Sequence, residues 1–397
     1  MNFKFKNKSG ITLIALIITI IVMLILVAVS ISVALNTGLF KSAGDATKNW
    51  KSAQDAEANI GSEIKIGDKT YSSIEEYIED TKPLPEIKAG EKATTTSKYE
   101  TAVIPAGFTV SGIKSETTID GGLVIYDIPE NELENVKWDG TEKTKYNQFV
   151  WIPVKVNKTV EPKDTETSIA SFYRSEWENN ERSTNLTEST TYTEPNTTDD
   201  KTGIASQIEN LTKSIYKYEG FYIGRYEAGS ETERTSTSDV TPMGIKQDMY
   251  PYNYVKWGES MSNIGTVGAV YLSNSLYNSS NSGATSMLCT GACWDSMLDF
   301  IKNTKNITSS ADWGNYNDAE FDITRGKYAV YSNGTLGNFQ NVNNEYPKAK
   351  NTSVLLTTGA SERNLAKNIY DVAGNLYEWT TESDSSDYRV FRGRQLL

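Results

Sequence analysis

The feature that most constrains this chain is an apolar run over residues 11–35, 25 residues without a charge. As an α-helix it would be about 38 Å long at ~1.5 Å per residue, more than the ~30 Å hydrocarbon layer of a bilayer. Its few polar side chains are hydroxyls, which can bond back to carbonyls of the preceding turn. We therefore expect a transmembrane helix that continues as a water-facing stalk helix to about residue 60.

The flanks of this run predict its orientation. Lys4, Lys6 and Lys8 precede it, and the first ten residues contain no acid. By the positive-inside rule this end stays cytoplasmic, which predicts a single-pass protein of the cell membrane with an extracellular C-terminal domain. A plain anchor and a secretory signal are the alternatives, but the run exceeds the 7–15 apolar residues usual in a cleaved signal.

The segment Lys8-Ser9-Gly10-Ile11-Thr12-Leu13-Ile14-Ala15-Leu16 resembles the leader of type IV pilins and pseudopilins. The resemblance implies cleavage between Gly10 and Ile11 by a prepilin peptidase, methylation of the new terminus, and the lipid bilayer and other pilin subunits as partners. The family usually has Glu at the fifth mature position, where this chain has Ala15. Incorporation into a surface filament therefore stays open.

Composition excludes several classes of function. A net charge of −12 argues against nucleic acid, since phosphate binding needs clustered Lys and Arg. The chain has no histidine, which excludes Ser-His-Asp and Cys-His mechanisms. It has two cysteines, Cys289 and Cys293, and we expect both to be buried structural residues without a disulfide.

The order of segments predicts a leader and helix followed by a β-rich domain. Strands are expected over 102–110, 121–127, 148–154 and 219–227, from apolar runs bounded by turn residues. A helix is expected after Thr290, a plausible N-cap, with apolar residues at a spacing of three or four. The predicted boundaries are 1–10 for the leader, 11–60 for the transmembrane and stalk helix, 61–100 for a short helix and linker, and 101–397 for the domain, with a Ser/Thr-rich insertion at 157–203.

The segment 368–380, Asn-Ile-Tyr-Asp-Val-Ala-Gly-Asn-Leu-Tyr-Glu-Trp-Thr, resembles a signature of the formylglycine-generating, sulfatase-modifying factor family. Shorter pieces at 220–227, 254–259, 288–298 and 389–393 are similar to family motifs in the usual order. The resemblance implies an α+β fold class: a long N-terminal helix followed by a C-type lectin-like domain with much irregular loop structure. Because the family's last strands would follow 389–393, we expect the domain to be C-terminally incomplete.

In this family the loop binds calcium, which implies a structural calcium ion held by the side chain of Asp371 and the carbonyls of Val372, Gly374 and Leu376. Carboxylate and main-chain oxygens suit such a hard cation. The alternative is an ordinary loop, with a turn at Gly374 and Asn375 and aromatic residues in the core. No copper is expected, since the family's copper-binding cysteines follow the motif at 389–393.

These features predict a non-catalytic, pilin-like bacterial surface protein that displays an adhesin-type head for an unknown extracellular protein or glycan. One alternative is a structural minor pilin or pseudopilin. A second is an extracytoplasmic oxidase of the formylglycine-generating type. The ligand-binding residues stay unknown at this stage.

Overall fold

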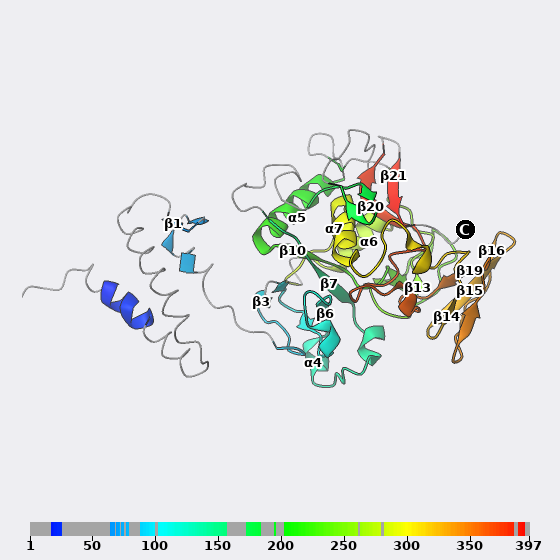
Figure 1. Cartoon of the computed structure of the whole chain (residues 1–397), viewed down its shortest axis with the longest axis horizontal. Helices are drawn as coiled ribbons and strands as arrows, with labels where there is room; N and C mark the ends of the chain where they lie inside the picture. The colour runs from blue at the N-terminus through cyan, green and yellow to red at the C-terminus, as the bar shows by residue number, and fades with distance from the viewer. Residues whose placement is uncertain are drawn as a thin grey trace, which may run out of the picture. The chain divides into compact units, whose positions relative to one another are not determined.

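The structure is a computed structural model that describes residues 17–25, 64–67, 69–71, 73–74, 77–78, 88–99, 102–156, 172–183, 194–195, 202–260, 263–278, 282–384 and 388–393 (Figure 1). The chain divides into two compact units, Met1–Lys82 and Pro83–Leu397.

The first unit contains a helix over 17–25 and a two-stranded hairpin of β1 (Ile64–Ile66) and β2 (Lys69–Tyr71). Residues 74, 77 and 78 are helical, within the short helix expected in 61–100. Across the described ranges of the whole chain, no helix combines the length and apolarity needed to span a bilayer.

This finding contradicts the predicted fold class with its long N-terminal membrane helix. The predicted transmembrane and prepilin character and the single-pass membrane localisation depended on that helix, and they are contradicted with it. The processing site at Gly10 and Ile11, and most of the predicted helix over 11–60, lie outside the described residues.

The described architecture is mixed α and β, and its main element is a four-stranded antiparallel sheet in the order β10-β7-β6-β5. Its alternating side chains enter two cores: Val150 and Ile152 face one cluster, while Trp151 between them faces the other. Burial on both faces accounts for the nearly continuous apolar run that predicted the central strand. The strands are β5 (Thr109–Val110), β6 (Val124–Tyr126), β7 (Gln148–Pro153) and β10 (Gly220–Gly224).

Helix α7 (Gly291–Ile301) packs in the first of these cores and confirms the helix expected after Thr290. The Thr290 side chain accepts the N–H of Cys293 at 3.0 Å, so the predicted N-cap is confirmed. Helix α5 (Ile204–Tyr218) was not predicted, although Ile204 and Ile208 are buried on one face at helical spacing. Figure 1 shows α5 and α7 as separate helices; α5 contacts β10, and α7 contacts β7.

The rest of the second unit consists of small sheets and short helices. Strand β3 (Ser97–Tyr99) pairs with β4 (Ala102–Ile104), so regular structure begins inside the predicted linker. The other helices are η1 (Lys114–Glu116), α4 (Glu130–Leu133), η2 (Thr141–Thr144), α6 (Ala269–Leu276), η4 (Ser310–Asp312) and η5 (Glu362–Asn364).

The other strands form sheets of two to four members. They are β8 (Trp177–Glu178), β9 (Glu181–Arg182), β11 (Gly229–Ser230), β12 (Met243–Gly244), β13 (Tyr250–Pro251), β14 (Phe321–Ile323), β15 (Lys327–Ser332), β16 (Thr335–Leu336), β17 (Gln340–Asn341), β18 (Tyr346–Lys348), β19 (Ser353–Leu356), β20 (Glu378–Ser383) and β21 (Arg389–Arg392).

The insertion predicted at 157–203 contributes to the interior as well as to the surface. Phe172 is buried in the first core, and the guanidinium of Arg174 pairs with the buried carboxylates of Asp295 and Glu382. Its hairpin of β8 and β9 is described, while much of the remainder of 157–203 lies outside the described residues.

A buried ion pair joins η1 to the chain beyond β10. The Arg225 side chain is 1% exposed and donates to Glu116 Oε1 at 2.7 Å. Tyr126 and Ser111 donate hydroxyl hydrogen bonds to Glu116 Oε2 at 2.9 and 2.7 Å. Burial works against ionisation of Glu116, but the Arg225 guanidinium outweighs it and leaves the pKa below its usual value. The pair stays charged because each member is hydrogen-bonded.

Replacing Arg225 by Met should leave the buried Glu116 carboxylate without its closest cation. We expect the free energy of unfolding, measured by urea denaturation, to fall by about 3 kcal/mol. The matched control is Lys213→Met, which removes the cation of the exposed Glu209–Lys213 pair on α5. Lys213→Met should lower the free energy of unfolding by no more than about 0.5 kcal/mol. Equal losses in the two variants would contradict this account.

Candidate functional site

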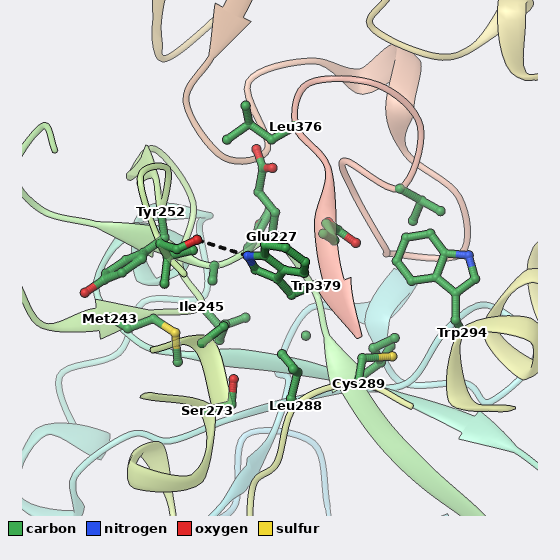
Figure 2. A pocket seen from close by; sticks show the side chains of 18 of the residues that line it. Glu227, Met243, Ile245, Tyr252, Ser273, Leu288, Cys289, Trp294, Leu376 and Trp379 are labelled. Carbon is green, nitrogen blue, oxygen red and sulfur yellow. Dashed lines mark hydrogen bonds between the residues drawn. The ribbon is translucent and has the colours of Figure 1, made fainter. Parts of the chain in front are cut away.

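A pocket of about 210 Å³ lies in the second unit, between the chain after β10, helices α6 and α7, and the segment 369–379. Most of its lining is aliphatic or aromatic. Figure 2 shows Trp379 and Glu227 at the centre of the view, with Ile245, Leu288 and Cys289 below them. Pockets that bind small molecules share this character, an apolar wall with a few polar groups.

The pocket wall is fixed by reciprocal hydrogen bonds from two tryptophans. Trp379 donates its indole N–H to the carbonyl of Val255 at 3.0 Å, drawn as the dashed line in Figure 2. Trp257 donates its indole N–H to the carbonyl of Thr380 at 2.9 Å. Strand β20 and the segment 255–257 are therefore held together in both directions.

Two acidic side chains, Glu227 and Glu378, line this apolar pocket. Glu227 is buried and its carboxylate accepts a hydrogen bond from the side-chain amide of Asn375. Glu378 is half-buried at the start of β20. Asp371 lies close enough to influence both, and it is buried as well.

Burial raises the pKa of all three carboxyl groups. It raises the pKa of Glu378 to about 8, with the neighbouring Asp371 carboxyl adding to the effect. It raises the pKa of Asp371 to about 7, opposed by the Gly359 N–H and by Arg325. The pKa of Glu227 is raised well above its usual value, first by burial and then by Asp371 and Glu378. At neutral pH Glu378 therefore holds a proton that an ordinary carboxylate would have lost.

No ion pair within the described ranges includes Glu227, Asp371 or Glu378. Arg325, which lowers the pKa of Asp371, pairs with Glu362. Arg392, whose backbone is paired with that of Glu378, directs its guanidinium to Glu382. The acids of the pocket thus differ from Glu116, which has its cation in contact.

The segment 371–375 is attached to the rest of the unit through Asn375. Its side-chain oxygen accepts the N–H of Leu356 at 2.9 Å and the amide of Asn315 at 3.2 Å. Its nitrogen donates to the carbonyl of Leu356 at 3.2 Å and to Glu227. Gly374 has φ +82°, and a Cβ there would come within 2.2 Å of the Asn315 carbonyl oxygen, so only glycine fits.

The residues predicted to hold calcium lie on the loop 371–376. The carbonyl oxygens of Leu376 and Val372 lie 3.5 and 4.0 Å from the place that a Cβ on Gly393 would occupy. One oxygen of the Asp371 carboxylate accepts the Gly359 N–H at 2.7 Å. Within the described residues no three acidic or cysteine side chains are grouped to hold a metal ion. The calcium site stays a prediction.

Cys289 lines the pocket, and Cys293 is buried one turn into α7. Burial raises the pKa of the Cys289 thiol well above its usual value, with Cys293 and nearby carboxyls adding to the effect. A thiol in this state is a poor nucleophile at neutral pH.

A second polar cluster lies at the N-terminus of α7, where Glu194 accepts the N–H of Gly291 at 2.8 Å and a hydrogen bond from the Thr381 hydroxyl. Burial raises the pKa of Glu194 to about 7. Glu194 is thus another residue of the insertion at 157–203, besides Phe172 and Arg174, whose side chain contacts interior residues.

Sequence reasoning did not identify the pocket or its acids. Glu227 ends an apolar strand, and Glu378 stands between Tyr377 and Trp379. The position of Glu378 between two aromatic residues was the one sequence feature that could have indicated a buried acid. The pocket itself is assembled from segments more than 150 positions apart in the chain, from residue 223 to residue 379.

No protein-family model matches the sequence, and no curated protein or solved structure matches the chain. The resemblance of 368–380 to the sulfatase-modifying factor family stays a prediction drawn from that motif.

The raised pKa of Glu378 predicts a stability that falls as pH rises. Between its ordinary value of 4.5 and its folded value of about 8, the folded state keeps a proton that the unfolded state loses. Glutamine has no such proton. Relative to the unmodified protein, Glu378→Gln should therefore gain stability steadily from pH 5 to pH 8 in urea titrations. The exposed Glu320→Gln is the control and should show a constant difference; a flat profile for Glu378→Gln would contradict the assignment.

Proposed function

We propose that residues 83–397 form a non-catalytic binding domain for a small, largely apolar ligand held in this pocket. The observation that carries the proposal is an apolar pocket of about 210 Å³ with two acidic groups on its wall. A dry cavity of ~150 Å³ is enough for a benzene molecule, so a ligand with one ring fits this volume. If the partner is a larger protein or glycan, only a terminal group of that partner would fit in the pocket.

The chemistry of the site supports binding over catalysis. The sequence contains no histidine, and the thiol nearest the pocket is protonated at neutral pH. The alternative, an oxidase of the formylglycine-generating type, would need a copper-binding cysteine pair after the motif at 389–393, whereas Cys289 and Cys293 precede that motif. The resemblance of 368–380 to that family therefore enters the proposal only through its loop, which forms one wall of the pocket.

The other predicted partners concern the N-terminal segment. Prepilin peptidase and pilin subunits would act at residues outside the described ranges, and they stay predictions.

A probe of the right size should bind in the pocket. We expect benzyl alcohol to show saturation transfer from the protein in ligand-observed NMR. Ser273→Phe, at a half-buried pocket position on α6, should abolish the transfer by filling the space. Ser275→Phe is the matched control, since Ser275 is exposed on the same helix and does not line the pocket. Equal transfer in both variants would place the probe elsewhere and contradict the proposal.

The predicted calcium ion gives a separate expectation. Millimolar calcium should raise the melting temperature relative to EDTA, because an ion bound only to the folded state stabilises it. Asp371→Asn should remove this increase, and magnesium should not reproduce it. An unchanged melting temperature in calcium would show that the loop is held by its hydrogen bonds alone.

A further inference from the structure

We propose that the ligand of this pocket is a small organic cation, an ammonium group on an apolar or aromatic body, recognised by Glu227 and Glu378. This inference rests on the proposed binding function and specifies its ligand class.

The first support is that the acidic groups of the pocket have no cationic partner. Two carboxyl groups line it, and Asp371 stands behind them, while no ion pair in the described part of the chain includes any of the three. Glu227 accepts a hydrogen bond from Asn375, a neutral donor. Buried acids normally have a cationic partner, as Glu116 has in Arg225. Here the ligand is the component that would supply the positive charge.

The second support is the aromatic surface next to these acids. Trp379 lines the pocket together with Tyr377, and Tyr377 is 44% exposed. Phe391 is 47% exposed, and its ring centroid lies 4.4 Å from that of Tyr377 and 5.5 Å from that of Trp379. An ammonium group is attracted to the faces of such rings, and tryptophan is the strongest of them.

The third support is the shortage of oxygen ligands for a metal ion. Calcium takes six to eight oxygens, and the pocket offers two carboxyl groups within a mostly apolar lining. An alkylammonium ion needs few acceptors and gains from contact between its body and the apolar wall. The composition of the lining therefore favours an organic cation over a metal.

The cationic groups nearest to the two acids are already paired with other carboxylates. On β20 and β21, Arg392 is paired with Glu382. Arg325, which acts on Asp371, is paired with Glu362. A ligand ammonium group would therefore meet no competing cation at Glu227 and Glu378.

The test is isothermal titration calorimetry of the full chain with benzylammonium chloride and with benzyl alcohol, which differ mainly in charge. At pH 7 we expect benzylammonium to bind at least about tenfold more tightly, as a charge-assisted contact should.

Glu378→Gln should bring the two affinities to within about twofold of each other. Glu227→Gln is the second variant, and its glutamine oxygen can still accept from Asn375. Glu320→Gln is the matched control and should behave like the unmodified protein. If neither pocket variant folds, the comparison of the two probes on the unmodified protein still decides.

The possible outcomes separate this inference from the binding function. Equal affinity for the two probes, with binding blocked by Ser273→Phe, would overturn the cation and leave the pocket as a binding site. Absence of binding by either probe would overturn both. Displacement of benzylammonium by calcium chloride would assign the acids to a metal ion and overturn the organic cation.

Discussion

The interaction on which the candidate site depends is the set of hydrogen bonds made by the Asn375 side chain. Asn375 is fully buried with φ +67°, and its amide connects the loop to β19, to Asn315 and to Glu227. Removing that amide would leave several buried polar groups without partners, each at a cost of about 1–3 kcal/mol. The Asn375 side chain thus holds the loop together with the backbone hydrogen bonds between Asn315 and residues 373–375, and it also contacts a pocket acid.

The two buried acid sites show how context decides the state of a carboxyl group. Glu116 is charged because Arg225 and two hydroxyls satisfy its oxygens in an interior that would otherwise exclude the charge. Glu378 has the same chemistry without a cation, and its proton is retained to a pH of about 8. The charge of Glu116 is balanced by a residue of the protein itself. Glu378 has no such partner, so it needs a proton or a positively charged ligand.

Local patterns in the sequence predicted local elements well. The run at 148–154 gave β7, and Thr290 with the apolar positions after it gave α7 and its cap, because both depend on side-chain periodicity and one hydrogen bond. The apolar run at 11–35 predicted a long membrane helix, which the described structure contradicts. Helix α5 was missed within a polar-looking region, although its buried face repeats at helical spacing.

The pocket could not have been derived in this way. Its wall combines β12, α6, α7 and the segment 369–379, and nothing in one segment indicates which others it meets. The loop at 368–380 forms one wall of the pocket, which its motif did not indicate, and its Asp371 accepts a backbone N–H from Gly359. The calcium ion expected at Asp371 stays a prediction.

The paired indole hydrogen bonds of Trp257 and Trp379 have a consequence for how quickly the pocket could exchange its contents. Each bond ties the backbone of one segment to the ring of the other, so neither segment can swing away while its counterpart stays in place. This part of the wall is therefore a fixed frame, and opening the pocket there would require both indole hydrogen bonds to break together.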